Sequence, residues 1–234
     1  MLKIKAEGRC HFCNKMYKSA GITRHLSGHL NNQEKGSAAR SRAFHVKVAG
    51  GPLYFLHLLM HEKLTLGHLD EYLRRIWLEC CGHMSSFQIK ENRIIPDWDA
   101  EEFGINKKRA IGKVLREDTI LEYEYDFGSM TYLEIKTVGV YQLDVPREIL
   151  LLSRNEPLPL LCHKCEEKPA VEFCTMWHEE EKIFCEKCAK LHAKECEDFA
   201  DYAAMPLVNS PRTGVCGYQG GVIDKERDGV WQGA

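Results

Sequence analysis

The sequence contains no apolar run near the roughly 18–20 residues that a membrane-spanning helix requires. The N-terminal stretch MLKIKAEGRC has no apolar core and no small-residue cleavage site, so we do not expect a secretory signal. A phosphate-binding glycine loop and a serine-nucleophile elbow are also missing, which argues against the enzyme classes built on them. These absences predict a soluble, cytoplasmic chain in a reducing compartment.

Cysteine, by contrast, is abundant. Eleven cysteines are an odd number, which fits a complete set of disulfides poorly. In a reducing compartment, closely spaced cysteines are more often metal ligands than disulfide partners. The cysteines therefore direct attention to metal sites.

Charge is distributed unevenly along the chain. The net charge is −2, but residues 1–47 contain ten Lys and Arg against two Asp and Glu, so the rest of the chain carries an excess of negative charge. A basic arm on an acidic body predicts that DNA or RNA would meet residues 1–47. The alternative is a solvated basic tail without a partner.

Residues 1–30 contain the spacing of a small metal-binding finger, Cys-x2-Cys followed by His-x3-His. Tetrahedral zinc takes four such ligands, and histidines at i and i+4 lie on one side of a helix. The segment resembles the two-Cys two-His zinc fingers, with Tyr17 and Ile22 at their core positions and Gly8 where an aromatic residue is common. The resemblance implies zinc bound by Cys10, Cys13, His25 and His29.

The same resemblance assigns the base-reading positions of the finger to Lys18, Gly21 and Arg24. Gly21 has no side chain, and one finger covers only about three base pairs. We therefore expect contacts from Lys18 and Arg24 that depend on phosphate charge and not on sequence. A protein-binding finger is the alternative.

A second cysteine-rich module occupies residues 156–204, with twelve acidic residues against six lysines. It is short and poor in large apolar side chains, so metal ligation rather than burial should hold it together. The order of the pairs predicts two interleaved zinc sites, formed by Cys162, Cys165, Cys185, Cys188 and by Cys174, His178, His192, Cys196. The arrangement resembles a B-box, and four protein ligands per ion indicate a structural zinc. His163, inside the first pair, is expected to be exposed.

The centre of the chain predicts an α+β domain with a mostly antiparallel sheet and one main helix, over residues 43–155. Steps of three and four between apolar residues predict a helix over 65–80 with Cys80 buried. Alternation in residues 121–125 predicts a strand with Leu121, Tyr123 and Tyr125 facing that helix. Polar residues 31–42 read as a linker, and residues 205–234 as an extended tail.

The hairpin sequence YEYDFGSMTYLEI resembles the plasmid pRiA4b ORF-three-like family, whose mark is Tyr-Asp-Phe-Gly, here residues 125–128. The stretches LDEYLRRIWLECCGHMSSF and NSPRTGVCGY are also similar to members of that family. The resemblance covers roughly residues 42–220 and implies the fold and a link to mobile elements. It implies no activity.

Taken together, the sequence predicts a non-enzymatic zinc protein that acts as a nucleic-acid-associated adaptor. A protein-interaction module with purely structural zinc ions is the first alternative. The second is a thiol-dependent enzyme at Cys81 and His83, although thiols at a helix C-terminus are poor nucleophiles because the partial negative charge there disfavours the thiolate. His57 and His61 are expected to pack within a strand, and Cys216 has no evident partner.

Overall fold

The computed structural model of the chain describes all residues except 1–3, 39, 90–99, 102–103, 177–181 and 233–234. The fold is α+β with mostly antiparallel sheets, as the sequence predicted. The chain divides into two compact units. The central unit consists of Lys5–Leu73 and His83–Asn155, and the C-terminal unit contains Arg74–Gly82 and Glu156–Ala234.

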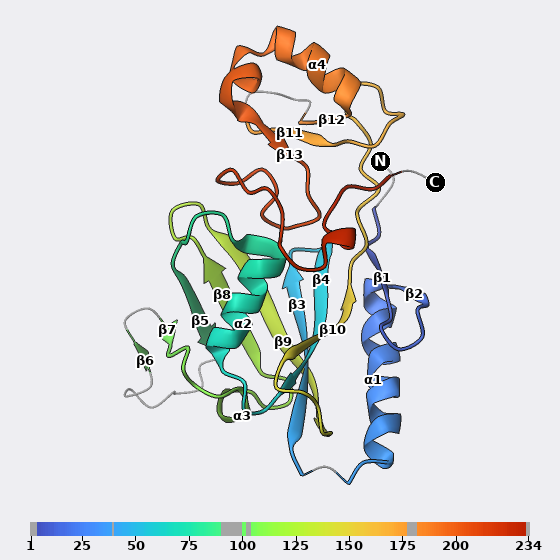
Figure 1. Cartoon of the computed structure of the whole chain (residues 1–234), viewed down its shortest axis with the longest axis vertical. Coiled ribbons are helices and arrows are strands. Elements are labelled where there is room, and N and C mark those ends of the chain that lie inside the picture. The colour runs from blue at the N-terminus through green and yellow to red at the C-terminus, as the bar shows by residue number, and fades with distance from the viewer. Residues whose placement is uncertain (1–3, 39, 90–99, 102–103, 177–181, 233–234) are drawn as a thin grey trace. The chain divides into compact units, whose positions relative to one another are not determined.

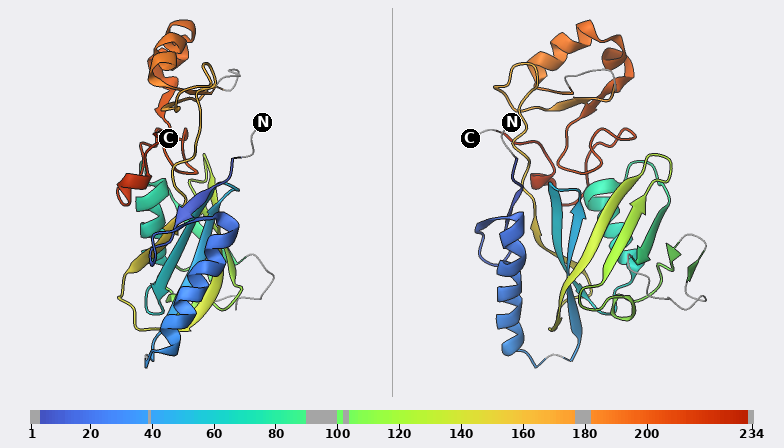
Figure 2. Two further views of the ribbon diagram at one scale, coloured as in Figure 1. Left: turned by 90° about the vertical axis from the view of Figure 1, so that its right-hand side faces the viewer. Right: turned by 180° about the vertical axis from the view of Figure 1, so that it is seen from behind.

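A six-stranded antiparallel sheet forms the body of the central unit (Figure 1). In the order in which they pair, its strands are β10 (Ile149–Arg154), β4 (Tyr54–His61), β3 (Arg42–Gly50), β9 (Thr131–Gln142), β8 (Ile120–Tyr125) and β5 (Ser85–Ile89). Helices α1 (Ser19–Lys35) and α2 (Leu66–Leu73) cover opposite faces of this sheet (Figure 2). The short helix α3 (Ile111–Val114) and the strand pair β6 (Ala100–Glu101) and β7 (Gly104–Ile105) complete the unit.

The α2 face of the sheet is built as the alternating pattern predicted. Leu121, Tyr123 and Tyr125 are fully buried, and the Tyr123 hydroxyl donates to Oδ1 of Asp70 on α2 at 2.7 Å. A tight turn follows β8. Asp126 takes a positive φ of 65°, and its Oδ1 accepts hydrogen bonds from the backbone N–H groups of Gly128 and Ser129.

The opposite face is covered by α1, which follows the hairpin of β1 (Glu7–Arg9) and β2 (Met16–Lys18). Ile22, Leu26 and Leu30 form a fully buried stripe along this helix, spaced four residues apart. Residues 31–42 were predicted to form a linker, but α1 continues to Lys35 and β3 begins at Arg42, so only residues 36–41 connect the two elements. Leu30 extends the buried stripe beyond the last histidine, so packing against the sheet prolongs the helix.

Gly8 has a specific reason to lack a side chain. It pairs with Asn155 in an isolated bridge, and a Cβ atom at this position would lie 2.7 Å from the carbonyl oxygen of Arg154. An aromatic side chain here would push the hairpin away from β10. The amino-terminal segment is therefore joined to the sheet edge as well as to its face.

In the C-terminal unit, strands β12 (Ile183–Phe184), β11 (Glu172–Cys174) and β13 (Ala204–Pro206) pair in that order beside helix α4 (Glu186–Glu195) and the π-helix η3 (Phe199–Ala203). A second π-helix, η1 (Arg74–Leu78), continues the chain from α2. Residues 205–234 were expected to form an extended tail. The described part of this range after β13, residues 207–232, instead folds into turns and the 3-10 helix η4 (Lys225–Arg227), with Ser210, Arg212 and Tyr218 fully buried.

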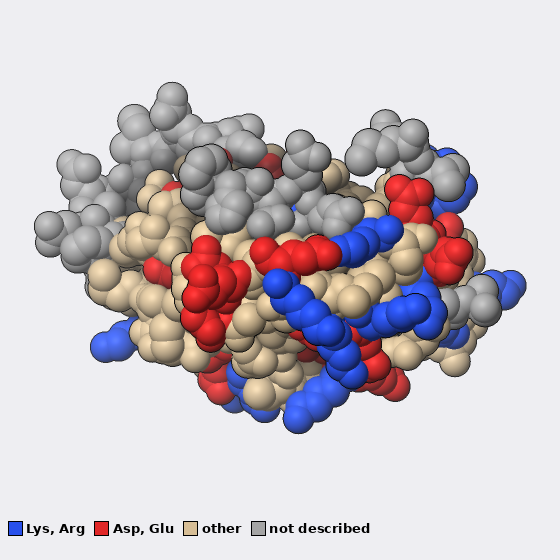
Figure 3. Space-filling model, turned by 90° about the horizontal axis from the view of Figure 1, so that it is seen from above, with Lys and Arg blue, Asp and Glu red and all other residues tan. Residues whose placement is uncertain are grey.

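Among the described residues, no helix combines the length and apolar character needed to cross a bilayer. On the face drawn in Figure 3, lysine and arginine side chains lie beside acidic ones. Charge of one sign does not dominate that face.

Candidate metal centres

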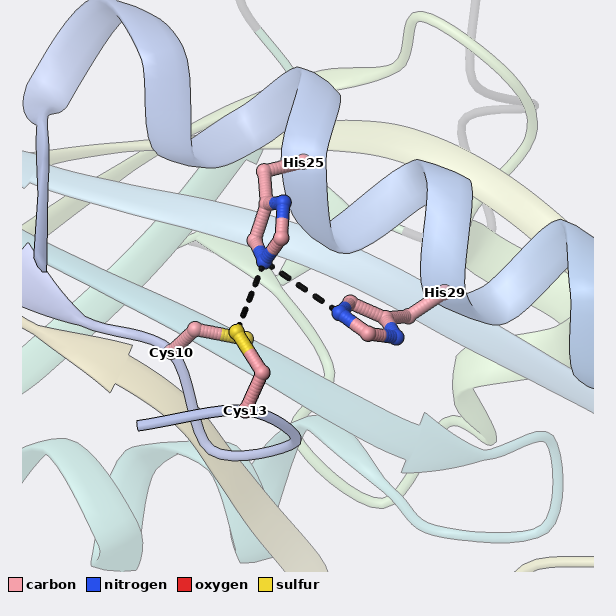
Figure 4. Close-up of side chains that lie close together, drawn as sticks. All are labelled: Cys10, Cys13, His25 and His29. Carbon is pink, nitrogen blue, oxygen red and sulfur yellow. Dashed lines mark hydrogen bonds between the residues drawn. The ribbon is translucent and has the colours of Figure 1, made fainter. Parts of the chain in front are cut away.

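The N-terminal cluster consists of Cys10, Cys13, His25 and His29, whose ligand atoms all lie within 4.8 Å of one another. Figure 4 shows the two cysteines of the hairpin loop and the two histidines of α1 pointing toward one another. Nε2 of His25 lies 3.2 Å from Sγ of Cys13 and 3.2 Å from Nε2 of His29. Neighbouring donors in tetrahedral zinc sites are roughly 3.3–3.8 Å apart, as bond lengths of about 2.0–2.3 Å require. The cluster can hold a metal ion.

The loop that carries its cysteines has the same turn as a loop in the C-terminal unit. Asn14 follows Cys13 with a φ of 60°, and its N–H donates to the carbonyl of Cys10 at 2.9 Å. Glu166 follows Cys165 with a φ of 55°, and its N–H donates to the carbonyl of Cys162, also at 2.9 Å. A left-handed residue after the second cysteine thus closes both loops and brings each pair of thiols together.

The electrostatics of the N-terminal cluster favour a metal ligand set. Burial, and next the neighbouring His29, lower the pKa of His25, which keeps its ring in the neutral form that binds metals. Burial also raises the pKa of Cys10. A divalent cation would compensate for this, because it stabilises the thiolate directly.

The first C-terminal cluster brings together Cys162, Cys165, Cys185 and Cys188, the four cysteines that the sequence grouped. Sγ of Cys165 lies 4.0 Å from Sγ of Cys185. Backbone N–H groups of Glu167 and Lys168 lower the pKa of Cys165 to about 7, whereas burial raises the pKa of Cys188 to about 12. Four thiols in so small a space can all ionise only beside a cation.

The second C-terminal cluster contains Cys174, His192 and Cys196, all buried. The expected fourth ligand, His178, lies outside the described residues. Nε2 of His192 is buried and, within the part of the chain that the structure describes, has no hydrogen-bond partner. A buried imidazole nitrogen beside two thiols fits a metal ligand, because an unsatisfied polar atom is costly in an apolar interior.

These two clusters also form the core of the module. Its largest group of buried residues contains Cys162, Cys174, Cys185, Cys188 and Cys196 together with Phe184, Ala189 and Phe199. The His192 ring stacks on Phe184 with centroids 4.3 Å apart. Helix α4 serves both clusters, since Cys185 caps it, Cys188 lies in its first turn and His192 in its last. His163 is exposed, as predicted.

The two candidate nucleic-acid residues lie at the start of the amino-terminal helix. Lys18 is the N-cap of α1 and Arg24 lies one turn into it, and both are exposed. Both are exposed, whereas Ile22 and Leu26 of the same segment are buried. Gly21 is exposed as well and offers no side chain.

The prediction that Cys80 is buried is wrong. The helix changes from α to π at Arg74, where the N–H of Glu79 donates to the carbonyl of Arg74 at 2.9 Å. The wider turn shifts the phase of the apolar stripe, and Cys80 becomes partly exposed. Its Sγ lies 3.7 Å from Sγ of Cys81, which lies 3.8 Å from Sγ of Cys216.

We call Cys80, Cys81 and Cys216 the thiol cluster. Sequence reasoning missed it because Cys216 is separated from the other two by more than a hundred residues. The unusual Cys-Cys dipeptide and the odd total of cysteines were the signals for a further grouping. Hydrogen bonding with Cys80, and then with Cys216, raises the pKa of Cys81 to about 11.

The histidines of the central sheet pack inside it, as expected. Nε2 of His45 lies 2.9 Å from Nδ1 of His57, and both side chains are fully buried. Burial lowers the pKa of His45 to about 4, and the pKa of His57 also lies well below its usual range because of burial and then the neighbouring His45. His61 is buried at the end of the same strand.

No family model matches the sequence, and a search of curated proteins found no match. Among solved structures, the chain is similar to a protein of unknown function, MM3350 from Methanosarcina mazei Go1, with 14% identity and a TM-score of 0.39. The similarity covers 48% of this chain and 67% of that one. At this level it carries no argument about function.

Proposed function

We propose that the protein is a zinc-stabilised, non-enzymatic adaptor that contacts nucleic acid through the exposed side of α1. The observation that carries this proposal is the contrast between buried apolar and exposed basic residues in the segment that begins at Lys18. Ile22, Leu26 and Leu30 are buried against the sheet, whereas Lys18 and Arg24 project into solvent. The metal cluster fixes the start of the helix on which the two cations stand. Zinc is the ion expected for Cys and His ligands at tetrahedral spacing.

The charge of the region supports the same proposal. Lys15, Lys35 and Arg40 are exposed in the same amino-terminal part of the chain, which carries ten basic residues against two acidic ones. The remainder of the chain is acidic and should repel phosphate. The proposal also includes membership of the pRiA4b ORF-three-like family, a link to mobile elements and a cytoplasmic location.

The test is the binding of labelled duplex DNA and RNA of mixed sequence to the full chain, measured by fluorescence anisotropy. Deleting residues 1–47 is unsuitable, because β3 begins at Arg42 and lies inside the sheet. We therefore use Lys18→Ala with Arg24→Ala, which leaves both the buried stripe and the metal ligands in place. The matched control is Lys187→Ala with Lys190→Ala, two exposed lysines of α4.

The finger variant should bind both nucleic acids more weakly at every sequence, and the α4 control should bind as the wild type does. Equal affinity of the wild type and the finger variant would refute the proposal. Nuclease treatment of material purified from cells provides the complementary check, since partners held through nucleic acid should be released.

The second candidate function is a protein-interaction module. It is favoured by exposed apolar side chains in the C-terminal unit, where Leu161, Leu191 and Tyr202 are 39%, 40% and 67% exposed. Partners that survive nuclease treatment and are lost in Leu191→Ser with Tyr202→Ser would support this function in place of the first.

The raised pKa of Cys81 disfavours an enzyme that uses this thiol as a nucleophile. Thiol neighbours raise the pKa of Cys81 to about 11, and the reactive form of cysteine is the thiolate. The thiol cluster is better suited to another role.

A further inference from the structure

The thiol cluster joins two segments that are distant in sequence but lie in one unit. Cys80 and Cys81 follow the π-helix η1, and Cys216 lies in the carboxyl-terminal turns. Their successive Sγ separations are 3.7 Å and 3.8 Å. Two sulfur ligands of one tetrahedral zinc ion are about 3.8 Å apart, whereas the sulfurs of a disulfide are about 2.05 Å apart. The spacing is that of metal ligands, and a disulfide would always leave one of the three thiols over.

Hydrogen bonds hold the segment that carries Cys80 against the carboxyl-terminal turns. Oγ of Ser210 donates to the carbonyl of Trp77 at 2.7 Å, and the N–H of Val222 donates to the carbonyl of Arg75 at the same distance. Gly221 packs so closely that a Cβ atom would lie 2.4 Å from the carbonyl oxygen of Ile76. Bonds on both sides of Cys216 thus fix the loop that carries it against the segment that carries Cys80.

The backbone at Cys216 is itself constrained. Cys216 has a φ of 50°, between Gly214 at 75° and Gly217 at 65°. A non-glycine residue in this left-handed region costs about 1 kcal/mol or more, and such conformations gather at functional sites. In this turn the cysteine itself takes the left-handed conformation, unlike the loops of Cys13 and Cys165, where the next residue does so.

A buried cation stands beside the cluster. Arg212 is fully buried, and its Nη2 lies 3.4 Å from Sγ of Cys80, where its N–H donates. A guanidinium next to a sulfur favours the thiolate, the form that binds metals. Arg212 would then also offset part of the negative charge that three thiolates carry with a divalent ion.

We propose that Cys80, Cys81 and Cys216 form a further metal site, which binds Zn²⁺ through three thiolates. Soft thiolate ligands select zinc over hard cations such as Mg²⁺. Each cysteine that binds loses its proton to solvent, so zinc binding releases protons without a change of oxidation state. The site is independent of the proposed contact with nucleic acid.

Cys81 and Cys216 are exposed, so this site should exchange its ion more readily than the buried clusters.

The test is zinc counting on the full chain. The protein is reduced, reconstituted with Zn²⁺ alone and weighed by native mass spectrometry. Cys216→Ser and Cys81→Ser should each bind one zinc equivalent less than the wild type. Val222→Ser, a change at an exposed position of the same segment, should bind as many as the wild type. Near-ultraviolet circular dichroism checks that each variant is folded.

Loading with Co²⁺ gives a second readout, because sulfur-to-cobalt charge-transfer absorption should fall in both cysteine variants and stay unchanged in Val222→Ser. The proposal is overturned if the cysteine variants keep the zinc content of the wild type. It is equally overturned if the protein, weighed under denaturing conditions after release of its zinc, is lighter by the two hydrogens of a disulfide among these three cysteines.

Discussion

Nε2 of His57, in the sheet, lies 3.3 Å from the hydroxyl of Thr23, on the helix that carries the N-terminal cluster. His57 in turn contacts His45, so a chain of polar groups crosses the buried layer between α1 and the sheet. The finger-like segment is therefore part of the central unit and not a separate module on a linker. Residues of α1 are therefore expected to contribute to the stability of the central unit.

The buried histidine pair predicts a loss of stability in mild acid. Burial places the pKa of His45 at about 4 and that of His57 well below 6.5, so below pH 6.5 the unfolded chain binds more protons than the folded chain. The free energy of unfolding should therefore fall as the pH is lowered from 6.5 toward 4, by about 1.4 kcal/mol per pH unit for His45, and the lowered pKa of His57 should steepen this fall.

Urea denaturation of wild type and of His45→Gln with His57→Gln, between pH 7 and pH 5, measures this effect. The metal clusters also bind protons in acid, but they are common to both proteins and cancel in the difference. The variant should show the shallower pH dependence. Parallel curves would show that the pair does not titrate on unfolding.

The extension of α1 predicts that Leu30 matters more than in an independent finger. Leu30 is fully buried although it lies beyond His29. Leu30→Ala should lower the free energy of unfolding by about 2–5 kcal/mol with the metal bound, because it leaves a cavity against the sheet. Asn31→Ala, at the exposed neighbouring position, should change it by less than about 0.5 kcal/mol. Denaturation in excess zinc makes the comparison, and similar effects of the two substitutions would contradict the packing of α1.

Metal removal should unfold the cysteine-rich module first. Structural zinc supplies on the order of 10–16 kcal/mol of apparent binding free energy, and the buried core of this module consists largely of cysteines. Chelation should therefore raise hydrogen exchange over residues 158–200 while strands β3, β4 and β9 stay protected. A folded module in protein shown by elemental analysis to contain no zinc would sink this assignment.

Within the same experiment, Cys162→Ser should raise exchange in residues 158–200 much more than Cys216→Ser. Cys162 is fully buried among the other thiols, whereas Cys216 is exposed. Loss of Cys216 should remove the ion of the thiol cluster without exposing the buried core of the cysteine-rich module. Equal effects of the two substitutions would remove the distinction between a core ligand and a surface ligand.

Nucleic-acid binding should depend steeply on salt. If residues 1–47 neutralise about four phosphates of a duplex, the logarithm of the affinity should fall with the logarithm of the salt concentration with a slope near −3.6. Removing Lys18 and Arg24 should reduce the steepness by about 2, because each phosphate contact contributes about 0.9. Anisotropy titrations between low and moderate salt give both slopes, and an unchanged slope in the variant would assign the contacts to other residues.

Much of the architecture follows from local patterns in the sequence. The alternation of apolar and polar residues predicted which side of β8 is buried. Asp126 begins the turn that connects β8 to β9. Apolar residues spaced three and four apart predicted α2. The spacing of cysteine pairs also grouped the ligands of the N-terminal and C-terminal clusters, because short loops and single helix turns bring such residues together whatever surrounds them. These features depend on neighbours close in sequence, so the sequence by itself determined them.

Tertiary packing decided the rest. The sheet buries Leu30 and so prolongs α1 through residues that read as a linker, and the π-turn at Arg74 moves Cys80 out of the apolar stripe. Cys81 and Cys216 meet only because the carboxyl-terminal turns are bonded to the segment after α2. Local spacing carries no information about a contact across 135 positions, since such a contact depends on which folded surfaces fit together.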